Sequence, residues 1–164
     1  MPAFLRLLPL LTALTLPALA ADTGPVTVEF PGAERYTDVR DRWVRTTPER
    51  NLNLKALRRH LEKAAARRLP PGETLTVRFT DIDLAGDYNT PLTGPGQDIR
   101  VVTELYPPRL AFDWERRSAD GAVIASGSEA LRDFGFLSHG AQRRNERLAF
   151  ERRLLDGWLQ QTLR

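Results

Sequence analysis

The sequence contains no cysteine, and this absence excludes several kinds of site at once. A chain without cysteine has no disulfide framework, no thiol nucleophile and no cysteine that could carry a lipid anchor. Histidine is also scarce, with only His60 and His139, so the usual zinc site built from cysteine and histidine cannot be assembled. The neighbouring Ser138 is not part of a G-x-S-x-G turn, so we expect both histidines to be ordinary polar residues.

Lysine is nearly absent as well, since it occurs only at Lys55 and Lys63 and all other basic residues are arginines. The net charge of +3 is small, and acidic residues are interspersed among the basic ones. Even the arginine-rich stretch 139–153 is interrupted by Glu146 and Glu151. This mixture is typical of a solvated surface, so nucleic acid is not expected as a partner.

Beyond residue 20 the chain has no long apolar run, whereas residues 1–20 are largely apolar. Arg6 precedes the apolar stretch, and Ala18 to Ala20 supply the small-x-small pattern that signal peptidase recognises. The stretch is shorter than a typical membrane span and contains prolines. We therefore expect a cleavable signal peptide at 1–20, a single α+β domain at 21–164 in the periplasm, and no membrane span after cleavage.

Alternating apolar and polar residues predict four strands, at 26–30, 74–84, 109–117 and 122–133. The apolar positions change parity near Thr80 and Asp81, which predicts a β-bulge in the second of these strands. Asp120-Gly121 predicts a hairpin that places Trp114 opposite Gly127. Residues 99–106 suit either a strand or a short helix, and the adjacent valines favour a strand.

Two helices are predicted from apolar residues at helical spacing. The first follows Thr47 as N-cap and Pro48 as first helical residue, and it ends before Pro70. The second covers residues 145–163. The order of elements predicts an α+β fold, with a mostly antiparallel sheet of four to five strands and two main helices packed on it.

The segment TDIDLAGD, residues 80–87, places three acidic side chains after an apolar run and allows three interpretations. As a calcium loop it lacks the oxygen ligand at its fifth position and the bidentate acid at its twelfth. A weak divalent-metal site of Asp81, Asp83 and Asp87 stays open, as does a catalytic pair of Asp81 and Asp83. The interpretation we favour is structural: the carboxylates accept backbone N–H groups at the bulge and pair with arginines.

Glu151 falls in the middle of the apolar stripe of the second helix. A carboxylate in that place must be paired or have a raised pKa, and we predict that it meets an arginine. Together with the other acids and arginines near apolar patches, it completes a predicted structural charge network of Asp38, Arg40, Asp81, Asp83, Asp98, Arg100, Arg109, Asp133 and Glu151.

Several segments resemble one family along nearly the whole chain after the predicted signal peptide. The most distinctive are DLAG at 83–86, YPPR at 106–109 and the D-x-x-FL pattern at 133–137. In this order they are similar to the exported bacterial family catalogued as domain of unknown function 3016. The resemblance implies export and a single domain, and it implies no activity, cofactor or catalytic residue.

The sequence therefore predicts a periplasmic domain with a binding or envelope-associated role, without catalytic residues and without a cofactor. The expected partner is an envelope protein or an anionic envelope component. The alternative is a weak divalent-metal binder or a metal-assisted hydrolase, centred on Asp81, Asp83 and Asp87.

Overall fold

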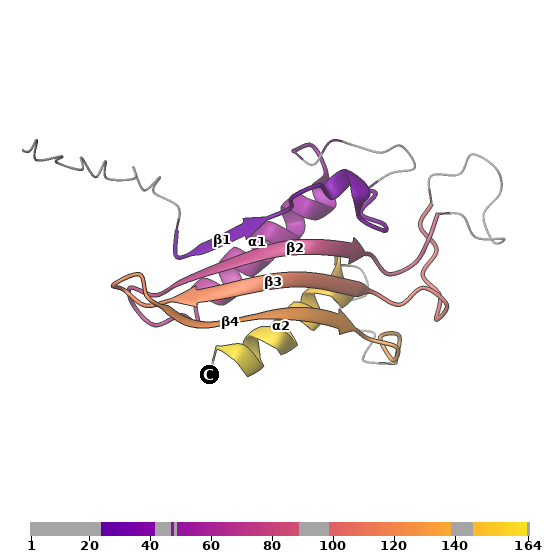
Figure 1. Cartoon of the computed structure of the whole chain (residues 1–164). Helices are drawn as coiled ribbons and strands as arrows, with labels where there is room; N and C mark the ends of the chain where they lie inside the picture. The colour runs from indigo at the N-terminus through magenta and orange to yellow at the C-terminus, as the bar shows by residue number, and fades with distance from the viewer. Residues whose placement is uncertain (1–23, 42–46, 48, 89–98, 139–145, 164) are drawn as a thin grey trace, which may run out of the picture.

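The computed structural model of the chain describes residues 24–41, 47, 49–88, 99–138 and 146–163. Within them the chain forms a four-stranded sheet and two main helices (Figure 1). The predicted signal peptide, Asp98 and His139 lie outside the described residues. No helix in these ranges is long and apolar enough to cross a membrane.

The strands are β1 (Val26–Glu29), β2 (Thr74–Asp83), β3 (Arg109–Arg117) and β4 (Val123–Arg132), and they lie in this order across the sheet. β1 pairs with β2 in parallel, whereas β2, β3 and β4 are antiparallel to one another. Adjacent parallel strands need a crossover, and the first helix provides it. The predicted α+β class with a mostly antiparallel sheet is confirmed.

The helices are α1 (Leu52–Ala66) and α2 (Ala149–Thr162), and a short 3-10 helix, η1 (Ala33–Arg35), follows β1. Both long helices contribute leucines to the same core as the alternate apolar residues of β2 and β3. The two helices therefore pack on one face of the sheet. They also touch each other, since the His60 ring of α1 lies 2.9 Å from the Asp156 carboxylate of α2.

The predicted bulge in β2 is confirmed, because the pairing of β2 with β3 shifts register between Phe79 and Asp81. After the shift, Ile82 and Leu84 are buried in the core. The predicted hairpin is confirmed too, with Trp114 opposite Gly127. A Cβ atom on Gly127 would lie 3.0 Å from the indole nitrogen of Trp114, so the glycine leaves room for the ring.

The predicted start of the first helix is wrong. α1 begins at Leu52, and Asn51 is its N-cap, with a side chain that accepts hydrogen bonds from the amides of Asn53 and Leu54. The Thr47 carbonyl instead closes a turn, because it accepts from the amides of Arg50 and Asn51. Both threonine and asparagine suit an N-cap position. The N-cap is Asn51, whose side chain also donates a hydrogen bond to the distant Val39 carbonyl.

The preferred strand at 99–106 is also wrong. Only Val101 makes a ladder contact there, an isolated antiparallel bridge to Asp87. Residues 104–105 form a turn, and the Tyr106 amide donates to the Thr103 carbonyl. The segment lies beside the end of β2 without extending the sheet.

Candidate functional site

The end of β2 is the place where most of the predicted charged residues meet. The four amides of residues 84–87 each donate to a different part of the chain: to the Asp38 carbonyl at 3.0 Å, the Glu151 carboxylate at 2.7 Å, the Tyr106 carbonyl at 3.0 Å and the Val101 carbonyl at 3.0 Å. Each donor is therefore satisfied by a long-range contact. This short segment joins the chain after β1, the chain before β3 and α2.

Gly86 makes this close approach possible. Its φ of +80° lies in the left-handed region, which residues other than glycine rarely adopt. A Cβ atom at this position would also lie 2.5 Å from the Val101 carbonyl oxygen. The glycine in DLAGD is thus required by both the backbone angle and the contact with residue 101.

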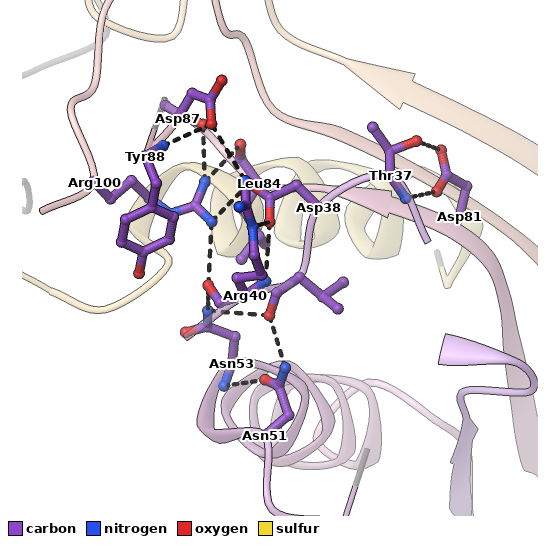
Figure 2. A network of polar contacts seen from close by, with 12 residues as sticks. Thr37, Asp38, Arg40, Asn51, Asn53, Asp81, Leu84, Asp87, Tyr88 and Arg100 are labelled. Carbon is purple, nitrogen blue, oxygen red and sulfur yellow. Dashed lines mark hydrogen bonds and ion pairs between the residues drawn. The ribbon is translucent and has the colours of Figure 1, made fainter. Parts of the chain in front are cut away.

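The buried Asp38 and the partly buried Arg100 form the centre of the network (Figure 2). The Asp38 residue is 8% exposed, and its Oδ2 accepts from Nη2 of Arg100 at 2.9 Å. The same guanidinium donates to the Gly86 carbonyl at 2.8 Å and to the Arg40 carbonyl at 3.1 Å. Arg100 therefore holds two backbone segments and one carboxylate together, which uses the planar, five-donor geometry of its guanidinium.

Arg40 completes the charge balance around Asp38. Its Nε donates to Oδ1 of Asp38 at 3.1 Å, and its Nη2 lies 3.3 Å from Oδ1 of Asp87. The hydrogen bond to Asp38 is the largest cause that raises the pKa of the Arg40 guanidinium. The guanidinium carbons of Arg40 and Arg100 lie 5.3 and 4.6 Å from the centre of the Tyr88 ring, within the range of cation–π attraction.

Two asparagines join this network to the start of α1, as Figure 2 shows. Asn51 donates to the Val39 carbonyl at 2.8 Å, and Asn53 donates to the Arg40 carbonyl at 2.8 Å. Sequence reasoning missed both residues. The available signal was the pair of asparagines that flank Leu52, because asparagine is a favoured N-cap.

The three aspartates of TDIDLAGD have separate partners. Asp81 accepts from the amide and hydroxyl of Thr37 at 2.7 and 2.8 Å. Asp83 accepts from Arg109 across the β2–β3 ladder, at 3.0 Å from Nε and 2.8 Å from Nη2. Burial raises the pKa of the Asp83 carboxyl, and the hydrogen bond from Arg109 opposes this shift. In the part of the chain that the structure describes, no three Asp, Glu, His or Cys side chains converge to hold a metal ion.

Glu151 is buried in the core, with 2% of its surface exposed. Within the described ranges it does not form the predicted ion pair with an arginine, and its carboxylate accepts from the Ala85 amide at 2.7 Å. Burial raises the pKa of the Glu151 carboxyl, while the Ala85 amide and the charges of Arg100 and Arg152 oppose the shift. A backbone donor has thus taken the place that we assigned to a guanidinium.

The remaining predicted residues lie elsewhere. Asp133 follows β4, where its Oδ1 accepts from the Gly135 amide at 2.9 Å, and Asp98 is outside the described residues. The Ser138 hydroxyl donates to the Gly135 carbonyl at 2.7 Å, so it closes the same turn. These contacts are local and do not reach the network around Asp38.

Two hollows lie near this region. A pocket of about 480 Å³ lies beside the network and is lined by Ala85, Tyr88, Arg100, Leu148, Phe150 and Glu151 among others. A larger groove of about 690 Å³ lies along α1 and is lined by Leu52, Lys55, Ala56, Arg59, His60, Lys63, Arg67, Arg147 and Arg152. We call the second one the basic groove, because the described residues that line it include six lysines and arginines and no acidic residue.

Comparison with known proteins gives one match. The model of a family described as "Protein of unknown function (DUF3016)" matches residues 24–161. No curated protein and no solved structure matches the chain. The match covers the fold from β1 into the last turn of α2, and with it the whole network at the end of β2. The chain therefore belongs to the family DUF3016.

Proposed function

We propose that this protein is an exported, periplasmic domain that binds a partner of the cell envelope and catalyses no reaction. The expected partner is an envelope protein or an anionic envelope component. The observation that carries the proposal is the use of the acidic residues at the end of β2. Asp38, Asp81, Asp83 and Asp87 each accept a hydrogen bond from an arginine, a threonine or a backbone amide.

A general acid or base must be within reach of a substrate proton, and a nucleophile needs an adjacent base. Carboxylates that are held by guanidinium groups and amides are poor candidates for either role. Their contacts instead stabilise the bent backbone between β2 and β3. We infer that the charge network is structural and that the function lies on the surface that this framework supports.

Export is the part of the proposal that rests on the sequence of residues 1–20. It is tested by expressing the full chain in a Gram-negative host and measuring the mass of the protein in the periplasmic fraction. We expect a periplasmic protein that begins at Ala21. A variant without residues 2–20 should stay in the cytoplasm. Recovery of the full chain in the cytoplasm would contradict export, and recovery of the uncleaved chain in the membrane fraction would contradict cleavage.

The proposal that the acids at the end of β2 hold no metal ion is tested by thermal melting with calcium, magnesium, manganese or zinc. We expect no cation to raise the melting temperature of the wild-type protein. A rise that disappears in the Asp83→Asn variant would contradict the proposal and support a metal site at the end of β2. The Asp113→Asn variant, with its carboxylate on β3 and hydrogen-bonded to Ser128, is a matched control.

A further inference from the structure

The basic groove carries an inference about the ligand of this protein. Four of its cations, Lys55, Arg59, Lys63 and Arg67, follow one another at intervals of four residues along α1 and its C-cap. Residues four apart lie on the same face of a helix, about 6 Å apart along its axis, so the row spans about 18 Å. The groove therefore presents a line of evenly spaced positive charges.

This row is unfavourable for the isolated helix. Like charges four residues apart repel each other, and the helix dipole disfavours Lys55 near the N-terminus, whereas it favours Lys63 in the last turn. Within the described residues none of the four cations has an ion-pair partner. A row of charges that opposes the stability of its own helix is explained most simply by an anionic ligand that compensates it.

The lining of the groove includes two further cations, one just before α2 and one in its first turn. Arg147 donates to Oδ1 of Asn53 at 2.9 Å, which places it beside the N-terminus of α1. Arg152 has a weak contact of 3.8 Å with Glu146, and its Nε is buried without an acceptor in the part of the chain that the structure describes. A buried donor without a partner is rare. The Arg152 side chain as a whole is 30% exposed, so it can contact an anion in the groove.

We infer that the basic groove binds a linear acidic polysaccharide. This inference deepens the proposed function and rests on it, because it assigns the binding surface and the chemical class of an anionic envelope component. A chain of sugars with recurring carboxylates fits a narrow row of cations, and guanidinium groups bind carboxylates in bidentate fashion. The aliphatic stems of the cations, with Leu52 and Ala56, line the groove against the sugar rings.

Two other polyanions fit this groove less well. Single-stranded nucleic acid is held by stacking of its bases on aromatic side chains, and among the described residues that line the groove His60 is the only aromatic one. A membrane surface is flat and is bound by a broad basic face or by an amphipathic helix with large apolar residues. Here Leu52 is the single large apolar residue among the described residues of the lining.

The first experiment titrates the protein, purified from cells that express the full chain, with oligogalacturonates of increasing length. Calorimetry should show an affinity that increases with oligomer length until the row of four cations is spanned and then levels off. The affinity should also fall as salt is added, because the contacts are exposed ion pairs. Equal affinity for a monomer and for a long oligomer would overturn the inference.

The second experiment compares two double variants that remove the same charge. Lys55→Ala combined with Arg59→Ala should lower the affinity about fivefold, which corresponds to about 1 kcal/mol for the loss of two exposed ion pairs. Arg78→Ala combined with Arg117→Ala removes two exposed arginines that pair with Glu29 and Glu115, and it should change the affinity less than about twofold. Equal losses in the two variants would show that net charge alone drives binding and would overturn the inference.

The third experiment offers the competing ligands. Vesicles that contain phosphatidylglycerol and a single-stranded DNA oligonucleotide are titrated under the same conditions. Tighter binding of either one than of the oligogalacturonate would overturn the assignment of the ligand. These measurements do not depend on the cellular location of the protein, so their failure is distinguishable from failure of the export test.

Discussion

Arginine has opposite surroundings in two regions of this protein. In the network at the end of β2, Arg40 and Arg100 contact carboxylates, backbone carbonyls and the Tyr88 ring. In the basic groove, Arg59 and Arg67 are exposed and lie in a row with two lysines. The same residue type therefore stabilises the fold in one region and opposes helix stability in the other.

This difference shows why counting arginines in the sequence is uninformative. A buried guanidinium is tolerated when nearly all of its donors have acceptors, and it then fixes the backbone around it. An exposed row of cations has no such structural benefit and points to an external anion. Substitutions in the two regions test this contrast, and their expected effects decrease from Arg100 to the cation row of α1.

Arg100→Ala should have the largest effect. The substitution leaves Asp38 with one guanidinium partner and removes the donor to the Gly86 and Arg40 carbonyls. Breaking a buried pair of this kind should lower the free energy of unfolding by about 3 kcal/mol. Urea unfolding measures the change, and Arg78→Ala on the exposed part of β2 should cost less than about 1 kcal/mol. Similar losses in the two variants would mean that the network is not structural.

Gly86→Ala should come next. Its backbone angle alone disfavours alanine by about 1–2 kcal/mol, and the contact of the new Cβ with the Val101 carbonyl adds to this cost. Gly121→Ala is a matched control, since its φ of +85° is similar and a Cβ there meets nothing within 4 Å. We expect the Gly86 variant to unfold at a clearly lower urea concentration than the Gly121 variant. Equal midpoints would show that the approach of residue 101 is unimportant.

Glu151→Gln should change how the free energy of unfolding depends on pH more than it changes the size of that free energy. Burial raises the pKa of Glu151 in the folded protein, so the folded state binds a proton more tightly than the unfolded state does. The stabilising contribution of Glu151 to the free energy of unfolding is therefore fully present below the pKa of the unfolded state. It is lost as the pH rises through the pKa of the folded state. Glutamine keeps the acceptor for the Ala85 amide and carries no charge.

The measurement for this residue is a series of urea titrations between about pH 4 and pH 8, which spans the usual pKa of a glutamate and the range above it. Relative to the wild type, the Glu151→Gln variant should gain stability as the pH increases. A variant that loses stability relative to the wild type over the same range would contradict the raised pKa. Glu151→Leu, which also removes the acceptor, should be destabilised by about 1–3 kcal/mol at every pH.

Lys55→Ala combined with Arg59→Ala should have the smallest effect on stability, and with the opposite sign. It removes two repulsions between residues four apart and introduces the best helix former, which together favour the fold by about 0.5 kcal/mol. Thermal melting at low salt should show a small rise. A lower melting temperature would mean that these cations have structural partners.

The regular elements of the fold could be predicted from local patterns. The change of parity near Asp81 indicated the bulge, and Asp120-Gly121 indicated the hairpin register. The choice of Asn51 over Thr47 as N-cap could not be predicted, because both residues suit the position and the contact of Asn51 with Val39 is long-range. The segment 99–106 has strand-forming valines but finds a ladder partner only at Val101.

Most residues of the candidate site could be predicted from the sequence, whereas several of their contacts could not. Burial of Glu151 follows from the apolar stripe of α2, whereas its partner, the Ala85 amide, cannot be seen in a sequence. A backbone amide carries no residue signature, so side-chain reasoning assigned an arginine instead. The cation row of α1 had a signal, the interval of four from Lys55 to Arg67, which is easily missed when only the apolar positions of the helix are followed.

The central claim is that cations at the end of β2 stabilise the fold, whereas cations in the basic groove do not. A single series of urea titrations on the wild type, Arg100→Ala and Lys55→Ala/Arg59→Ala tests it directly. The account predicts a large loss of unfolding free energy in the first variant and no loss, or a small gain, in the second. Losses of similar size in both variants would contradict it.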